Sequence, residues 1–159
     1  MTTIAWLRRL YASVFWADDR ALESPGPEDR DARRYLHHLL VAEQVWLLRL
    51  RGASSAGIEL WPQLTDERAR ALADENRAGY ERLLANLADV DLARPVEYAN
   101  QSGRRFSTAT GDILLHVALH GAYHRGQFAR ALREGGGAPP NTDHITFARE
   151  EDAIPFRVP

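Results

Sequence analysis

The chain has 159 residues, a length typical of one domain; 45% of the residues are apolar and 26% are charged. This balance is that of a folded globular protein, and it excludes a disordered chain, a collagen-like repeat and a coiled-coil rod. The absence of cysteine excludes disulfides, thiolate zinc sites and cysteine nucleophiles. All 20 basic residues are arginine, which excludes Schiff-base chemistry on lysine, and a net charge of −2 provides no electrostatic basis for binding nucleic acid.

No targeting or membrane segment is expected. The first nine residues, MTTIAWLRR, lack the apolar core of a signal peptide. No apolar run approaches the ~18 residues that a membrane helix needs. The expected location is therefore cytoplasmic.

Four long segments with helical patterning follow one another along the chain, at about residues 2–23, 29–51, 66–89 and 111–134. Pro25-Gly26-Pro27 separates the first two segments, because proline lacks an amide hydrogen, and three consecutive glycines end the fourth. Helices near 20 residues long span about 30 Å, the length of a small bundle. The predicted fold class is all-α: a four-helix bundle with one long crossover, which is the candidate location of a short β-hairpin.

Three further features complete the expected architecture. The stretches 96–100 and 104–108 flank turn residues and predict a short β-hairpin before the last helix. Thr65, followed by two acidic residues, is a typical helix N-cap. Residues 1–159 are expected to form a single domain with an irregular tail from about residue 138. Four apolar residues indicate that this tail packs back onto the bundle: Ile145, Phe147, Ile154 and Phe156.

The histidines of the fourth segment indicate a functional site. His116, His120 and His124 recur at four-residue intervals, so they lie on one helix face together with apolar residues. A column of buried imidazoles is costly, because each unpaired polar group costs about 1–3 kcal/mol. A metal ion removes that cost by accepting the nitrogen lone pairs, and an i, i+4 pair can hold one ion from one side.

A third ligand has to come from a facing helix, and the second segment offers His37 and His38. A helical wheel places His38 on the apolar face and His37 on a face with arginines. The predicted metal site is therefore His38, His120 and His124, with open positions that are typical of a catalytic centre. His116 is interpreted as a fourth ligand, a neighbour of a ligand or a core residue, of which the last two are favoured. A histidine-lined core without metal stays an alternative.

The segment 116–127, HVALHGAYHRGQ, resembles the histidine-rich signature of the DinB/YfiT-like superfamily. The segments 38–47 (HLLVAEQVWL), 15–18 (FWAD) and 137–143 (GAPPNTD) are similar to three further elements of that family. The similarity runs in order from about residue 5 to 143. One departure is Asp18, which stands where the family often has asparagine.

The resemblance implies a bundle of the up-up-down-down type, often a homodimer, that holds a divalent zinc or nickel ion through His38, His120 and His124. It also implies hydrolase chemistry or the transfer of a low-molecular-weight thiol such as glutathione, mycothiol or bacillithiol. A metal ion lowers the pKa of a bound water toward ~7 and deprotonates a coordinating thiol, so one site suits both reactions. The thiol has to be a cofactor, because the chain has no cysteine.

Four further residues are candidates for roles near this site. Asp18 makes the site more anionic if it approaches the metal, and a surface position is the favoured interpretation. Glu43 is interpreted as a partner of a ligand, a salt bridge between helices or a solvated charge. Gln127 lies three residues after His124. It is the better candidate for a residue that contacts a metal-ligating histidine without binding the metal itself. Arg125 is expected to bind a carboxylate or to tie helices together.

Three functions stay open at this point. The first is a metal-dependent enzyme, a thiol S-transferase or a hydrolase, acting on an unidentified small molecule, with no catalytic residue assigned. The second is a non-catalytic metal-binding bundle that acts as a stress-related or interaction protein. The third is a metal-free bundle. Neither nucleic acid nor a membrane is an expected partner.

Overall fold

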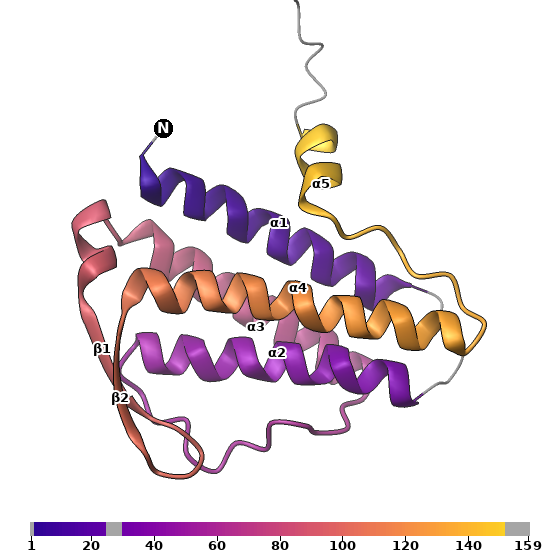
Figure 1. The fold of residues 1–159 in the computed structure, drawn as a ribbon, viewed down its shortest axis with the longest axis horizontal. Coiled ribbons are helices and arrows are strands. Elements are labelled where there is room, and N and C mark those ends of the chain that lie inside the picture. The colour runs from indigo at the N-terminus through magenta and orange to yellow at the C-terminus, as the bar shows by residue number, and fades with distance from the viewer. Residues whose placement is uncertain (1, 25–29, 152–159) are drawn as a thin grey trace, which may run out of the picture.

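The computed structural model describes residues 2–24 and 30–151, and four long helices dominate it (Figure 1). They are α1 (Thr3–Glu23), α2 (Arg30–Leu50), α3 (Asp66–Ala85) and α4 (Thr110–Glu134). These bounds confirm the predicted helices and the all-α fold class. The largest difference is at α3, which stops at Ala85 and is followed by the 3-10 helix η1 (Asp89–Ala93). None of the described helices combines the length and the apolar character that crossing a membrane requires.

The helix ends follow from capping chemistry. The Thr65 hydroxyl oxygen accepts a hydrogen bond from the backbone amide of Arg68 at 3.2 Å, so this residue is the N-cap of α3, as predicted. The end of α4 falls where the three glycines begin. Gly136 has a φ of +83°, and the amide of Gly137 donates to the carbonyl of Leu132 at 2.8 Å. The left-handed conformation of Gly136 turns the chain so that the next amide reaches a carbonyl of the last helical turn. This is the usual role of a glycine at that position.

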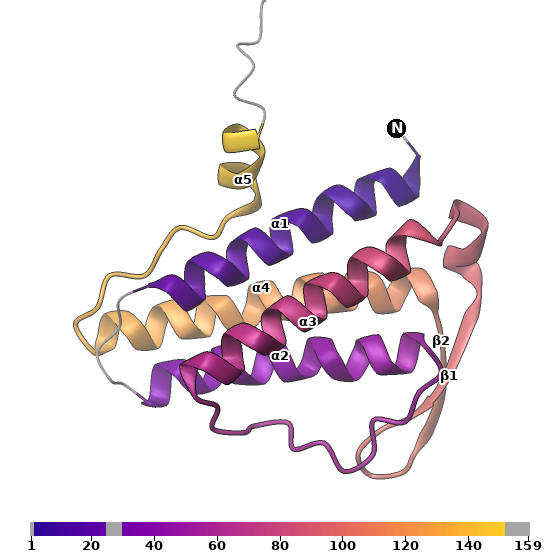
Figure 2. The same ribbon diagram turned by 180° about the vertical axis from the view of Figure 1, so that it is seen from behind.

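The order of helix directions is up-down-down-up, because α1 and α4 run one way and α2 and α3 the other (Figures 1 and 2). The up-up-down-down order that the resemblance implies is therefore wrong for this chain. Six residues, 24–29, separate α1 from α2. They reach at most about 25 Å and are too short to return along a helix of about 31 Å. The 15 residues 51–65 between α2 and α3 are long enough, and they form the crossover along the bundle (Figure 2). The crossover therefore does not carry the hairpin, which lies between α3 and α4.

The predicted hairpin is confirmed. Strands β1 (Pro95–Ala99) and β2 (Arg105–Ala109) pair antiparallel, with Tyr98 opposite Phe106. The hairpin packs against α2 and α4 at the end of the bundle where α2 finishes and α4 begins (Figure 1). A lone hairpin is marginal in water, so this contact with the helices is what stabilises it.

Two clusters of buried apolar side chains fill the interior, and each draws residues from all four helices. A layer of buried polar residues lies at or near the boundary between the two clusters. We call this the polar layer, and each long helix supplies one member: Asp18, Glu43, Asn76 and Arg125. Buried polar groups need partners, so this layer constrains how the four helices align.

The segment after α4 contains a short helix, α5 (His144–Glu151), which patterning did not reveal. Phe147 is buried and packs edge-to-face on Trp16 of α1, with the ring centroids 5.8 Å apart. Ile145 is exposed, and Ile154 and Phe156 lie outside the described residues. The expected packing of the tail onto the bundle therefore holds for Phe147.

Candidate metal centre

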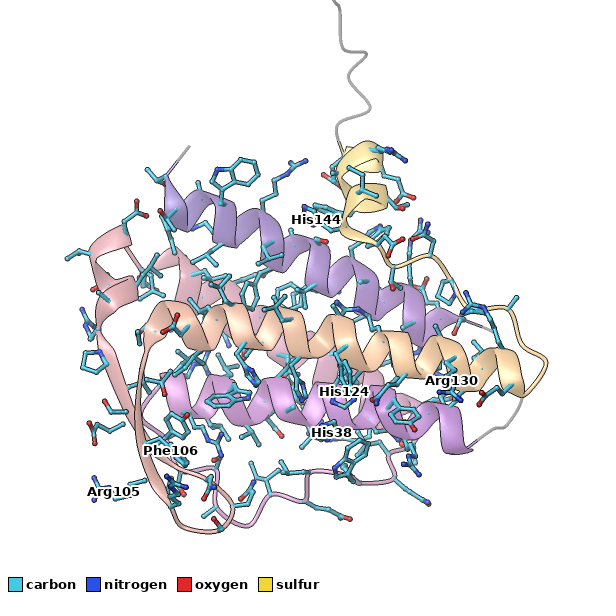
Figure 3. All side chains as sticks on the ribbon, in the orientation of Figure 1. His38, Arg105, Phe106, His124, Arg130 and His144 are labelled. Carbon is cyan, nitrogen blue, oxygen red and sulfur yellow. The ribbon has the colours of Figure 1, made fainter. Side chains whose placement is uncertain are left out.

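The facing surfaces of α2 and α4 bring three histidines together. His38 comes from α2, while His120 and His124 come from adjacent turns of α4. One ring nitrogen from each lies within 4.8 Å of the other two. Figure 3 labels His38 and His124, which lie side by side where the two helices meet. These are the three residues that the sequence analysis selects.

The spacing of the nitrogens suits a shared ion. The Nε2 atoms of His120 and His124 lie 3.1 Å apart. Two nitrogens at about 2.0–2.1 Å from a tetrahedral zinc ion are separated by about 3.3 Å. The donor set, three imidazole nitrogens, also suits zinc or nickel. The residues present therefore fit a divalent transition metal.

The crossover orients the His38 ring. The Nδ1 atom of His38 lies 2.6 Å from the carbonyl oxygen of Leu60. A carbonyl only accepts, so Nδ1 carries the hydrogen and Nε2 keeps a free lone pair. Trp61 stacks on the His38 ring at 3.8 Å with an interplanar angle of 4°. Sequence reasoning missed both residues, because a loop has no periodicity that marks its inward positions.

Gln127 lies next to His124, as the sequence analysis expects. Its side chain raises the pKa of His124, although burial and the neighbouring His38 lower it overall. The Nδ1 atom of His124 and the Oε1 atom of Gln127 are buried, and neither forms a hydrogen bond with a described residue. Gln127 is therefore a close neighbour of His124 with an unused acceptor on the buried side of the ring.

The surroundings of all three imidazoles favour their neutral form. Burial is the main cause that lowers the pKa of each of His38, His120 and His124. Burial and repulsion from the neighbouring histidines lower the pKa of His120 to about 4. Neutral rings carry the lone pairs that a metal ion requires.

The other two helical histidines differ from expectation. His116 is exposed at the edge of the site, with its ring 5.3 Å from His120 and 5.1 Å from Trp46, so it is not a core residue. The helical wheel predicts that His37 lies on the arginine-bearing face, away from the core, and this is wrong, because His37 is buried. The crossover covers it, and its Nδ1 accepts a hydrogen bond from the amide of Leu64 at 3.2 Å.

Asp18 lies in the polar layer and is only 3% exposed, so the surface interpretation is wrong. Its Oδ1 accepts a hydrogen bond from Nη1 of Arg125 at 2.7 Å, and both side chains are buried. The expectation that Arg125 binds a carboxylate is confirmed. The pair joins α1 to α4, one residue after His124, across 107 positions of sequence. A helical wheel compares only residues of one helix, so it could not identify this partner.

Glu43 extends the polar layer to α2 and α3, and it is not a solvated charge. Its Oε2 accepts a hydrogen bond from Nδ2 of Asn76 at 3.2 Å. Burial and the negative charge of Asp18 raise the pKa of Glu43 well above its ordinary value. Oδ2 of Asp18 and Oε1 of Glu43 are buried and form no hydrogen bond with a described residue. Burial and the nearby carboxylate of Asp18 therefore favour the protonated form of Glu43.

The fold and the site define a four-helix bundle with a candidate three-histidine metal centre. Residues 17–154 match the model of the DinB family, and the chain belongs to that family. Protein DinB of Bacillus subtilis (strain 168) is 28% identical over 115 residues, 69% of this chain and 67% of that protein. The crystal structure of a DinB-like protein from Bacillus cereus ATCC 10987 matches with a TM-score of 0.63 at 20% identity. That match covers 85% of this chain and 94% of that one, and it shows a shared fold.

Replacing Asp18 with alanine should lower the stability of the protein far more than the same replacement of Asp19. Asp18→Ala leaves Arg125 buried without a counter-charge and should lower the free energy of unfolding by about 3–5 kcal/mol. Asp19→Ala is the matched control: it loses only a half-exposed ion pair with Arg77, worth about 1 kcal/mol. Urea unfolding followed by circular dichroism measures both variants. Equal losses would contradict the role of the pair.

The raised pKa of Glu43 predicts a pH dependence with a defined sign. A group whose pKa is raised by folding contributes stability that is complete below its unfolded pKa and is lost as pH rises. Glu43→Gln mimics the protonated acid, so the variant and the wild type should match near pH 4. At pH 8 the variant should be the more stable of the two. Urea unfolding across this range measures the difference, and parallel curves would contradict a raised pKa of Glu43.

Proposed function

We propose that this protein holds one divalent metal ion, zinc or nickel, through Nε2 of His38, His120 and His124. The observation that carries the proposal is the convergence of three imidazoles from two helices. The carbonyl of Leu60 accepts from Nδ1 of His38, which leaves Nε2 of His38 as the donor, and Gln127 lies next to His124. Such outer partners are a usual feature of histidine metal sites.

We further propose that the centre is that of a metal-dependent enzyme, a thiol S-transferase or a hydrolase. A divalent ion held by three uncharged ligands acts as a Lewis acid that favours the deprotonated form of a thiol or water. The chain has no cysteine, so the thiol is a low-molecular-weight cofactor. The chain itself supplies three oriented donors, fixed by the crossover on one side and by α4 on the other.

A second candidate is a metal-binding bundle without turnover, acting as a stress-related or interaction protein. One observation favours it. Among residues 2–24 and 30–151, no aspartate or glutamate hydrogen-bonds to any of the three histidines, and Asp18 and Glu43 are engaged in the polar layer. No acid or base is thereby assigned to catalysis. A homodimer and a cytoplasmic location stay predictions under either candidate.

Replacing any of the three proposed ligands with alanine should weaken zinc or nickel binding by more than about 100-fold. Loss of an outer partner alone costs about 10–100-fold, which is the expected range for Gln127→Leu. His116→Ala is the control in the same helix and should have a milder effect. Calorimetric titration of chelator-treated protein measures the affinities, with circular dichroism to verify folding. Equal losses at His116 and His124 would overturn the assignment.

The two candidate functions differ in their response to thiols. Glutathione, mycothiol and bacillithiol are titrated into the protein with and without cobalt, whose absorption reports a change of ligands. The enzyme hypothesis predicts that one thiol alters the spectrum of the wild type and leaves that of His124→Ala unchanged. Metal binding with no response to any thiol would exclude the thiol-transferase hypothesis and favour the hydrolase or the non-catalytic bundle. A hydrolase would then show metal-dependent turnover of ester or amide substrates.

A further inference from the structure

Arg49, in the last turn of α2, is a buried cation without a counter-charge. Its side chain is only 7% exposed, and it forms no ion pair with any described residue. Burial lowers the pKa of its guanidinium from the ordinary value, and no carboxylate opposes this effect. Buried charges in proteins are normally paired, so this residue requires an explanation.

The protein stabilises this charge in part. The guanidinium carbon lies 4.5 Å from the ring centroid of Trp46 and 4.9 Å from that of Tyr98. Its position in the last turn also suits the negative end of the helix dipole. Neither effect supplies a hydrogen-bond acceptor. Nε donates to the hydroxyl oxygen of Ser55 at 3.2 Å. The two Nη groups form no hydrogen bond or ion pair with residues 2–24 and 30–151, and they are not among the fully enclosed unpartnered atoms, so they are accessible to a ligand.

Arg49 lines a cavity of about 430 Å³ between the start of the crossover and the tip of the hairpin. Its other walls are residues 52–57 and the hairpin residues 97–101 and 103. The Ser55 oxygen already accepts from Arg49, so its hydroxyl hydrogen is free to donate into this space. The Oδ1 atom of Asn100 accepts from the turn, which leaves its amide NH₂ as a further donor. The cavity therefore presents several donors around one cation.

The one acidic side chain in the wall does not neutralise Arg49. The Glu97 side chain is 67% exposed, and its carboxylate lies 3.8 Å from Arg105 on the opposite strand. The cavity is also separate from the histidine site. Trp46 contacts residues of both, since its ring centroid lies 4.5 Å from the guanidinium carbon of Arg49 and 5.1 Å from the ring of His116, and none of the three histidines lines the cavity. The hairpin, marked by Arg105 and Phe106 in Figure 3, lies well apart from His38 and His124.

We propose that this cavity is a second binding site, which takes the carboxylate or phosphate group of a small molecule on the guanidinium of Arg49. A planar guanidinium whose face rests on aromatic rings presents its N–H edge to an oxyanion, and it forms paired hydrogen bonds there. The volume is in the range of small-molecule sites. An oxyanion supplies the missing counter-charge and accepts from the Nη groups and from Ser55.

The test is the melting temperature of the full chain against added inorganic phosphate or acetate, with sodium chloride holding ionic strength constant. EDTA is present throughout, since oxyanions also bind metal ions. A ligand that binds only the folded state raises the melting temperature saturably. The wild type should show this rise with at least one probe, and the better probe identifies the preferred oxyanion. Arg49→Met, which keeps a long apolar side chain without the charge, should show no rise.

Arg104→Met is the matched control. Arg104 is an exposed arginine of the same hairpin that lies over an aromatic ring, 5.1 Å from the centroid of Phe106. This variant should respond as the wild type does. Arg49→Lys and Ser55→Ala serve if Arg49→Met fails to fold, and each should weaken binding about tenfold, the lower end of the effect of one charge-assisted hydrogen bond. A wild type that responds to sodium chloride alone would overturn the proposal. So would equal responses in all the variants.

Discussion

The ion pair between Asp18 and Arg125 is the contact on which the geometry of the bundle depends. It lies in a layer to which each long helix contributes one polar side chain, between two apolar clusters. Apolar clusters tolerate small shifts of one helix along another, but a buried charge without its partner is strongly destabilising. The layer therefore selects one alignment of the helices. Arg125 directly follows His124, so the alignment that pairs Arg125 also orients the candidate metal centre.

The crossover is a functional part of the molecule as well as a connection. Its carbonyl at Leu60 and its ring at Trp61 orient His38, and its amide at Leu64 satisfies His37. Its first residues place Ser55 against Arg49. One loop thus touches both the histidine cluster and the proposed anion site. The short connection between α1 and α2 cannot span the bundle, so the long loop falls after α2 and covers the side where His38 lies.

Much of the candidate site was predictable from local spacing. The four-residue interval places His120 and His124 on one face, and the apolar face of the second helix selects His38 over His37. The same helical spacing predicts that Gln127 lies next to His124. The burial of Asp18 and His37 was not predictable, because each is covered by a segment distant in the chain. Trp61 was missed for a related reason: its role depends on the path of a loop, which no periodicity records.

The sequence by itself determined the four helices, the hairpin, the glycine stop after α4 and the three histidines, because helical periodicity and capping act over a few residues. It also carried the signature by which the chain is recognised as a member of the DinB family. Only the tertiary structure decided the order of helix directions and the raised pKa of Glu43. It alone also revealed the uncompensated charge of Arg49. These depend on which groups meet across the bundle, and burial and electrostatics between distant residues act only once the chain is folded.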